Sequence, residues 1–268
     1  MNKVIGFIGS GNMGQAMIGG IVKSNLVPAT NIIVSDLNEA SLKKVNEKFG
    51  VLTTTNNEEV AKKADILVLS VKPNLYDVVI KGIKKLVKEN VVIVAIAAGK
   101  TLDSVQNAFE KEIKVVRAMP NTPALVGEGM AALCTNNMIT KEDMKEVVSI
   151  FESFGEAEVV SEKLIDAVVA VSGSSPAYIY MFIEAMADAA VLEGMPRSQA
   201  YKFAAQTVMG SAKMVLETGT HPGELKDMVC SPGGTTIEAV AELEKKGFRA
   251  AVISAMKLCA DKSKEMSK

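Results

Sequence analysis

The sequence predicts an α/β domain of the Rossmann type over residues 1–160, followed by an all-α domain over residues 161–268. Three observations predict this fold class. Short runs rich in valine and isoleucine alternate with amphipathic helical stretches in the first part. A glycine-rich turn directly follows the first of these runs. From Lys163 onward the sequence contains no convincing strand.

Apolar runs in the first part predict parallel β-strands that helices cover on both faces. Helical spacing follows the first two runs, at residues 12–24 and 38–49. Two later runs, at residues 129–136 and 156–160, predict edge strands around a helix at residues 141–153. The parallel strands are expected at residues 3–9, 31–36, 64–71, 91–98 and 113–119.

The second part predicts helices at residues 174–195, 197–219, 235–245 and 248–265. In the second of these helices one apolar stripe is formed by Ala200, Ala204, Val208 and Val215. The first is apolar nearly all round, with only Glu184, Asp188 and Glu193 as charged residues between its flanking prolines. Such a helix is buried, either within its own domain or against another subunit. Because a domain of about a hundred residues has little interior, we expect an oligomer interface.

Composition excludes several classes of protein. The 268 residues are 48% apolar and 23% charged, which is typical of a globular chain with a sizeable core. A net charge of −1 provides no broad field for nucleic acid or acidic membranes, and only 4% of the residues are aromatic. Cys134, Cys230 and Cys259 have no zinc-site spacing, and the chain has one histidine. We therefore expect a reduced, cytoplasmic protein without a bound metal.

Targeting and membrane segments are not expected either. The N-terminal residues MNKVIGFIGSG lead directly into a strand, which is unlike a signal peptide. No uncharged apolar run approaches the ~20 residues that cross a bilayer.

Gly9, Gly11 and Gly14 form a G-x-G-x-x-G motif between the first strand and the first helix. In a dinucleotide-binding fold these glycines provide the tight turn, the close approach to a pyrophosphate and the close packing of helix on strand. The helix N-terminus adds free N–H groups and partial positive charge. Because the motif has a strand before it and a helix after it, we interpret it as a dinucleotide site.

Asp36 ends the second strand, about 20 residues after Gly14, where an acid binds the ribose 2′-hydroxyl of NAD. No lysine or arginine follows until Lys43, which slightly favours NADH, whereas Ser35 suits either NADH or NADPH. The alternative is that Asp36 only caps the helix that begins near Asn38.

Two further strand ends lie at the edge of the sheet where ligands bind in this fold. Lys72 and Pro73 belong to the sequence SVKPN after the third clear strand, and the lysine faces either the cofactor or solvent. The fourth strand ends in AIAAGK, where small residues let a flat ring approach the backbone.

Few residues are available for proton transfer. The sole histidine, His221, precedes Pro222 and is expected to cap or order a helical turn. The helix at residues 174–195 has no lysine, which argues against a 3-hydroxyacid dehydrogenase. A protonated imine would need little acid catalysis, because hydride addition neutralises it.

Several motifs resemble those of the pyrroline-5-carboxylate reductase family, and the similarity covers essentially the whole chain. They are GFIGSGNMG, SVKP, RAMPNTPALVGEG, SGSSPAY and HPGELKDMVCSPGGTTIEAV. The resemblance implies that NADPH or NADH reduces the cyclic imine Δ1-pyrroline-5-carboxylate to L-proline, the last step of proline biosynthesis. It also implies that the C-terminal helices form a dimerisation domain, so that a homodimer results, which in some members assembles further into a decamer.

The resemblance also assigns residues to the site. Ser231, Gly233, Gly234 and Thr235 would bind the substrate carboxylate, and the Thr236 hydroxyl would orient the imine nitrogen or assist its proton as the catalytic group. The alternative is a turn with a threonine cap. Asn121 would lie in a rigid corner near the cleft, where it could bond the cofactor amide. The implied cofactor-binding residues are Gly9, Ser10, Gly11, Asn12, Met13, Ser35, Asp36, Asn57, Val71, Lys72, Pro73, Ala97 and Ala98.

Two other functions stay open at this point. One is a reductase of a different cyclic imine acid or of a 3-hydroxyacid. The other is a non-catalytic dinucleotide sensor whose helices bind a partner protein, but this leaves the residues around Gly233 and Gly234 without a role.

Overall fold

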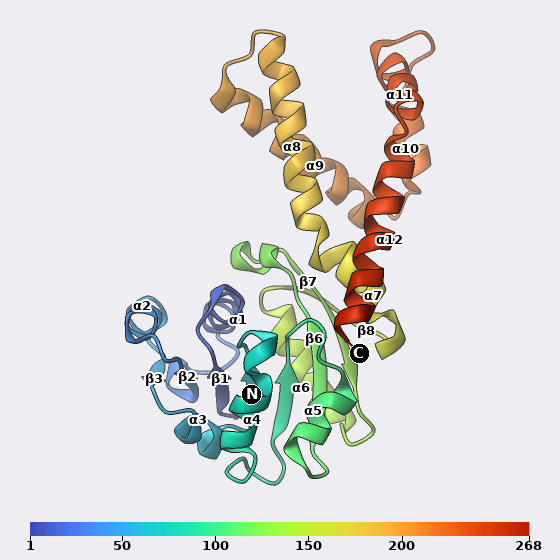
Figure 1. The fold of residues 1–268 in the computed structure, drawn as a ribbon. Helices are drawn as coiled ribbons and strands as arrows, with labels where there is room; N and C mark the ends of the chain where they lie inside the picture. Colours follow the sequence, from blue (N-terminus) through green and yellow to red (C-terminus); the bar gives the residue numbers. More distant parts are fainter. Residues whose placement is uncertain (268) are drawn as a thin grey trace. The chain divides into compact units, whose positions relative to one another are not determined.

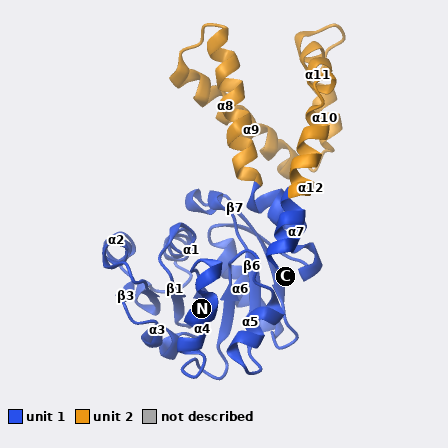
Figure 2. Ribbon diagram, viewed as in Figure 1, with its two compact units in different colours: residues 1–174, 259–268 blue, residues 175–258 orange. Residues whose placement is uncertain are grey.

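A computed structural model of the protein describes residues 1–267 (Figure 1). The chain divides into two compact units, which are coloured separately in Figure 2. The first comprises Met1–Ser174 together with the chain from Cys259 onward, and the second comprises Ser175–Leu258. Residues 161–174 therefore make their contacts within the first unit, although the sequence assigns them to the helical domain. The domain boundary at residue 160 stays a prediction.

The first unit contains an eight-stranded sheet in the order β3-β2-β1-β4-β5-β6-β7-β8. The strands from β1 to β6 pair in parallel, and their order 3-2-1-4-5-6 is that of a Rossmann fold, which confirms the predicted fold class. These six strands are β1 (Ile5–Ile8), β2 (Ile32–Ser35), β3 (Leu52–Thr54), β4 (Ile66–Leu69), β5 (Val92–Ala95) and β6 (Lys114–Met119).

Two differences from the predicted sheet have simple causes. The sequence prediction missed β3, because it has only three residues and its Leu52 is exposed, so it lacks a buried apolar run. Of the two predicted edge strands, β7 (Gly129–Thr135) lies inside the sheet, antiparallel to β6 and parallel to β8 (Gly155–Val159). Only β8 ends the sheet on that side, which corrects the prediction for residues 129–136.

Helices cover both faces of this sheet, because alternate residues of its strands point to opposite sides. Phe7 of β1 belongs to a core with α1 (Asn12–Lys23), α2 (Glu39–Phe49) and α6 (Lys141–Glu152). Ile8, the next residue, belongs to a second core on the other face. That second core includes the helices α3 (Asn57–Lys63), α4 (Tyr76–Ile83) and α5 (Leu102–Phe109).

In the described residues after β8, all regular elements are helical. The helix α7 (Ile165–Val168) leads into one π-helical turn, Val169–Gly173, which the sequence did not predict. Four of the later helices agree with the predicted ranges within a few residues, namely α8 (Ser175–Leu192), α9 (Arg197–Thr218), α11 (Thr235–Lys245) and α12 (Phe248–Met266). The short α10 (Pro222–Met228) was missed, although His221 caps it as expected, because its Nδ1 accepts a 3.1 Å hydrogen bond from the Gly223 amide.

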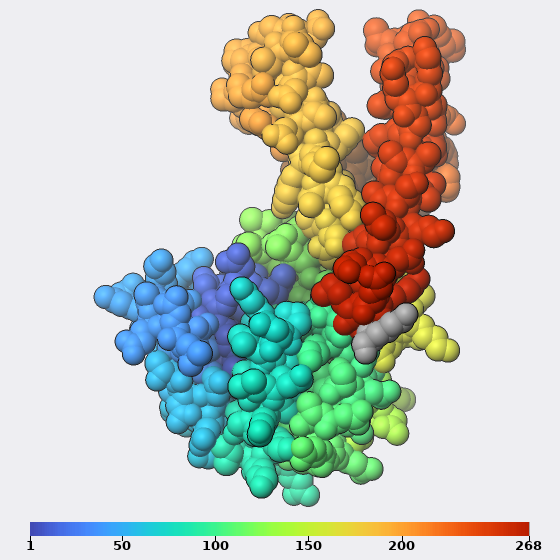
Figure 3. All heavy atoms as spheres, in the orientation of Figure 1, coloured from blue at the N-terminus to red at the C-terminus, as the bar shows by residue number. Residues whose placement is uncertain are grey.

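The second unit has almost no core of its own. Only Ala187, Ala200 and Ala204 are buried among residues 175–258, and they lie where α8 and α9 pack together. Large apolar side chains are open to solvent, among them Met181, Phe203 and Leu216, which are 68%, 62% and 82% exposed. The space-filling view shows α8 and α11 uncovered on the face that is drawn (Figure 3). A second molecule is therefore needed to cover this surface.

One helical stretch, Glu162–Leu192, is long and apolar enough to cross a membrane by length and composition alone. The most apolar part of this stretch is only 17% buried within the single chain.

Candidate functional site

The passage from β1 into the first turn of α1 requires glycine at two positions for packing. Gly9 has a positive φ of 104°, and a Cβ there would lie 2.6 Å from the carbonyl oxygen of Ser70. A Cβ on Gly14 would lie 2.8 Å from the carbonyl oxygen of Gly9. The Ser70 hydroxyl donates a 2.7 Å hydrogen bond to that same carbonyl, so the ends of β1 and β4 are held together here. This is the point in the strand order where a Rossmann fold binds its ligand.

Gly11 differs from the other two glycines. A Cβ at this position would meet no atom within 4 Å, and the φ of −67° is ordinary. As the N-cap of α1, Gly11 provides no side-chain hydrogen bond to the first turn. The open space and the free N–H groups at the start of a helix of 12 residues form a cradle for an anion.

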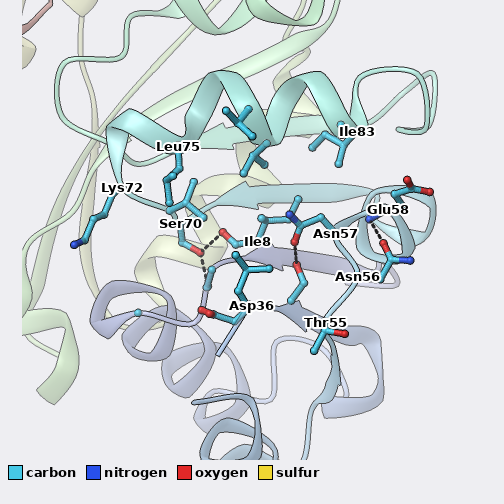
Figure 4. A pocket seen from close by; sticks show the side chains of 18 residues that line it. Ile8, Asp36, Thr55, Asn56, Asn57, Glu58, Ser70, Lys72, Leu75 and Ile83 are labelled. Atoms are coloured by element: carbon cyan, nitrogen blue, oxygen red, sulfur yellow. Dashed lines mark hydrogen bonds between the residues drawn. The ribbon is translucent and has the colours of Figure 1, made fainter. Parts of the chain in front are cut away.

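A cavity of about 770 Å³ lies beside this loop (Figure 4). Among its lining are seven of the predicted cofactor residues: Gly9, Gly11, Ser35, Asp36, Asn57, Val71 and Lys72. The other six lie outside the lining of this cavity, although all lie within a few residues after β1, β4 or β5: Ser10, Asn12, Met13, Pro73, Ala97 and Ala98.

Sequence reasoning missed one wall of the cavity. The wall is apolar and comes from α4, along its length, and from the turn before it, with Leu75, Val78, Val79 and Ile83. Leu37, which is 87% exposed, adds an apolar side chain after β2. The sequence feature that could have predicted this wall is the amphipathic run directly after Pro73. An apolar wall of this kind suits a flat ring.

Polar side chains gather at the ends of β2 and β3. The Ser35 hydroxyl donates a 2.8 Å hydrogen bond to Oδ1 of Asn57, so the Asn57 side chain is held against β2. The neighbouring Asn56 caps α3 instead, accepting a 2.9 Å hydrogen bond from the Glu58 amide. Thr55, Asn56 and Glu58 also line the cavity, and the missed strand β3 explains why they were not predicted.

Asp36 is bound more tightly than a helix cap requires. Its Oδ2 accepts 2.7 Å hydrogen bonds from both the amide and the hydroxyl of Ser10, and its Oδ1 accepts a 2.9 Å bond from the Asn38 amide. Burial raises the pKa of Asp36, but the bonds from Asn38 and Ser10 outweigh this and hold it below its ordinary value of 3.8. The N-cap of α2 is Asn38 itself, so capping does not account for the contacts with Ser10.

The strand end at Ala97 is positioned by a buried tyrosine. The Tyr76 hydroxyl accepts hydrogen bonds from the amides of Ile96, at 3.1 Å, and Ala97, at 3.2 Å. Ala97 is buried, whereas Lys72 on the neighbouring loop is exposed. The structure therefore fixes the backbone at the end of β5, whereas the Lys72 side chain extends into solvent.

Asn121 has its polar atoms engaged within the protein. Its Nδ2 donates a 3.1 Å hydrogen bond to the carbonyl oxygen of Ser172, and its Oδ1 accepts a 2.9 Å bond from the Met130 amide. These bonds make the turn before Pro123 a rigid corner, and they account for Asn121 without a bond to a cofactor.

The glycine-rich stretch in the second unit forms an open helix start. Gly234 is the N-cap of α11, without any side-chain hydrogen bond, so the alternative of a threonine cap is wrong. The Gly234 amide donates a 3.0 Å bond to the carbonyl oxygen of Ser231, which closes the turn. Gly233 has a positive φ of 66°, a conformation that L side chains rarely adopt. This turn exposes the first N–H groups of an 11-residue helix beside the hydroxyls of Thr235 and Thr236.

Family models match both parts of the chain. Residues 162–266 match a model described as pyrroline-5-carboxylate reductase dimerisation. Residues 4–99 match one described as NADP oxidoreductase coenzyme F420-dependent.

Proteins with similar sequences span the full length of the chain. A pyrroline-5-carboxylate reductase of Escherichia coli K12 is 56% identical over 268 residues, which cover all of both chains. One of Methanosarcina acetivorans is 45% identical over all of this chain and 99% of its own. One of Arabidopsis thaliana is 41% identical over 98% of this chain and 95% of its own.

Solved structures agree over the same extent. The pyrroline-5-carboxylate reductase of Coxiella burnetii has a TM-score of 0.94 at 35% identity and covers all of both chains. The pyrroline carboxylate reductase of Plasmodium falciparum with NADP bound has a TM-score of 0.91 at 34% identity, over 100% of this chain and 99% of its own.

Proposed function

This chain belongs to the pyrroline-5-carboxylate reductase family, and from this premise we propose how its residues divide the work of the reaction. The chain is an NAD(P)H-dependent oxidoreductase that reduces the C=N bond of Δ1-pyrroline-5-carboxylate to give L-proline, the last step of proline biosynthesis. The observation that carries this conclusion is the 56% identity to a pyrroline-5-carboxylate reductase over every residue of both chains.

The first unit fits a nicotinamide dinucleotide, since the open position above Gly11 leaves room for a pyrophosphate at the start of α1. The bound dinucleotide supplies a hydride. In our proposal the loop residues Gly9, Ser10, Gly11, Asn12 and Met13 hold the pyrophosphate. The adenosine ribose lies against Ser35, Asp36 and Asn57. The nicotinamide side is lined by Val71, Lys72, Pro73, Ala97 and Ala98.

The second unit holds the carboxylate of the substrate. Ser231, Gly233, Gly234 and Thr235 surround the anion with hydroxyl groups and the free N–H groups at the start of α11, and hydrogen bonds to a charged group are roughly twice as strong as neutral ones. The Thr236 hydroxyl, one residue further along, orients the imine nitrogen or assists its proton. Neither role needs the histidine, whose Nδ1 is engaged in capping α10.

The helical units assemble as a homodimer, and a decamer would be a pentamer of such dimers. The exposed apolar faces of α8 and α9 support the homodimer, because three buried residues do not make a core for an independent unit. The apolar stretch Glu162–Leu192 is then covered by a second subunit rather than by a membrane. In this assembly the carboxylate-binding turn of one subunit completes the cofactor site of another. We place the enzyme in the cytoplasm. Its small-molecule ligand besides the dinucleotide is a cyclic imine carboxylate, and it does not bind nucleic acid.

The test is a steady-state assay of the purified protein with NADH and NADPH side by side. We expect turnover with pyrroline-5-carboxylate, and much less with pyrroline-2-carboxylate or a 3-oxoacid. Thr236→Ala should lower kcat about a hundredfold or more, since an acid–base group typically contributes about 10²–10⁴-fold, with little change in dinucleotide affinity. Gly234→Val should raise the KM for the imine, because the added side chain fills the anion site.

A control and two contrary results make the assay decisive. Thr207→Ala should leave all constants unchanged, because that hydroxyl bonds only the Phe203 carbonyl of its own helix. Tight dinucleotide binding without turnover on any imine would instead support a non-catalytic sensor. Loss of dinucleotide binding alone in Gly234→Val would overturn the assignment of the carboxylate site.

A further inference from the structure

We propose that Asp36, held in place by Ser10 and Ser41, makes this enzyme discriminate in favour of NADH against NADPH. The inference rests on the proposed dinucleotide site and adds to it a choice between the two cofactors, together with the residues that enforce this choice.

The carboxylate of Asp36 is tethered through both of its oxygens. Oδ2 accepts from the amide and hydroxyl of Ser10, and Oδ1 accepts from the Asn38 amide. The Leu37 amide adds a further backbone hydrogen bond, which is the weakest of the four. Asp36 lines the cavity, where Figure 4 shows it among the side chains of the lining. Because a carboxylate offers about four acceptor positions, a hydroxyl donor of a ligand would take the one that Leu37 holds weakly.

Ser41 belongs to the same network. Its hydroxyl lies 2.7 Å from the Ser10 hydroxyl and 3.3 Å from the Ser10 carbonyl oxygen, to which it donates. Ser10 is only 1% exposed, so its hydroxyl has no alternative partner in solvent. Because Ser10 is fixed between Ser41 and Asp36, the carboxylate cannot turn aside without breaking charge-assisted hydrogen bonds.

Charges around the cavity are unfavourable to a phosphate. The charged residues of its lining are Asp36, Glu58 and Lys72, and the lysine follows β4 rather than β2. The first cation after Asp36 in the sequence, Lys43, lies 3.8 Å from Glu47 on the outer surface of α2 and does not line the cavity. Hydrogen bonding also keeps the pKa of Asp36 below its ordinary value, so the carboxylate stays ionised at neutral pH.

The two cofactors differ at one position of the adenosine ribose. NADH has a 2′-hydroxyl, which can donate a hydrogen bond to a carboxylate after β2. NADPH has a phosphate there, whose charge of about −1.5 to −2 would face the ionised carboxylate of Asp36 without a cation between them. The Asp36 carboxylate therefore accepts a hydrogen bond from the 2′-hydroxyl of NADH and repels the 2′-phosphate of NADPH.

Calorimetric titration of the full-length protein with each dinucleotide, in the absence of any imine, tests the proposal. We expect the Kd for NADPH to exceed that for NADH by about tenfold or more, as for like charges at close range near a protein surface. Asp36→Asn keeps the size of the side chain and removes its charge, and it should bring the two Kd values within about threefold of each other. Asp36→Ser provides a second variant with the same expectation if the asparagine protein is poorly folded.

The matched control is Glu58→Gln, which removes the other acidic group from the same cavity. It should change the ratio of Kd values much less than the Asp36 variants do, because the Glu58 carboxylate is paired with Lys62 at 3.4 Å. Equal or tighter binding of NADPH by the wild type would overturn the proposal. So would an unchanged ratio in both Asp36 variants, or an equal change in Glu58→Gln. None of these results would contradict the proposed function. That function is tested separately, by turnover of the imine with either dinucleotide.

The part played by Ser41 has its own test. Ser41→Ala should reduce the ratio of Kd values by about twofold to fivefold, as expected for the loss of one hydrogen bond, with little change in the unfolding temperature. Ser41→Thr, which keeps the hydroxyl, should restore the ratio. A wild-type ratio in Ser41→Ala, or an equal loss in Ser41→Thr, would show that Ser41 does not position Asp36.

Discussion

The hydroxyl group of Tyr76 donates a 2.6 Å hydrogen bond to the carbonyl oxygen of Leu69, the last residue of β4. The hydroxyl oxygen of Tyr76 also accepts hydrogen bonds from the amides of Ile96 and Ala97, just beyond β5. One side chain thus joins the two strands where their own hydrogen-bond ladder stops. The loops that follow these strands are those assigned to the nicotinamide side of the cofactor.

Tyr76→Phe should therefore affect both stability and cofactor binding. Burial raises the pKa of Tyr76 well above its ordinary value of 10.0, so the hydroxyl stays protonated and donating. Phenylalanine keeps the ring but leaves one buried carbonyl and two amides without this partner, at a cost of about 1–3 kcal/mol in the free energy of unfolding. Urea unfolding measures the loss, and titration should show severalfold weaker dinucleotide binding. Unchanged values in both measurements would contradict this role.

Alanine substitutions in the first glycine loop should separate packing from binding. The Cβ added in Gly11→Ala would have no atom within 4 Å, so the unfolding temperature of this variant should stay within a few degrees of wild type. Its added methyl group occupies the anion cradle, and dinucleotide affinity should fall about tenfold or more. Gly9→Ala should instead destabilise the fold, because its Cβ would lie 2.6 Å from a carbonyl oxygen. Normal affinity in Gly11→Ala would remove this cradle from the cofactor site.

A charge on the helical unit should break the oligomer. Met181→Glu places a carboxylate on the exposed apolar face of α8, where desolvating it in an interface would cost several kcal/mol. Analytical ultracentrifugation should show a smaller species with reduced activity. Leu52→Glu is the control, because Leu52 is 46% exposed on β3 and should leave the sedimentation coefficient unchanged. Assembly that is insensitive to Met181→Glu would contradict an interface at α8.

Asp143 should make stability depend on pH in the acid range. Burial raises its pKa, but hydrogen bonds from Lys114 and from Thr140, with which it forms a capping box, outweigh this and lower it below 3.8. A depressed pKa in the folded state stabilises the protein above pH 3.8, and this contribution is lost as the pH falls through the folded-state value.

Asp143→Asn should accordingly cost about 1–2 kcal/mol at pH 7, measured by urea unfolding at equal protein concentration. The difference from wild type should shrink steadily below about pH 4. A difference that stays constant down to about pH 3 would mean that the carboxylate charge is not what stabilises α6.

Much of the fold could be predicted because its signals are local. The strand at Ile5–Ile8 has four buried residues in succession, three of them with large apolar side chains, and Gly9 follows at a turn that requires a positive φ. The stripe on α9 was also visible, since Ala200 and Ala204 are buried and Val208 and Val215 are half-buried. By contrast, three residues at Leu52–Thr54 and seven at Pro222–Met228 are too few for a periodic pattern.

The sequence by itself determined which segments become strands and helices, and it placed glycines where backbone conformation demands them, because those signals depend on neighbouring residues. Only the tertiary structure decided which side chains meet. Ser10 lies after β1, whereas Asp36 follows β2 and Ser41 lies in α2. The apolar cavity wall from α4 meets β1 only through the order of the strands. Contacts of this kind depend on how the sheet is assembled, and no local pattern of residues encodes them.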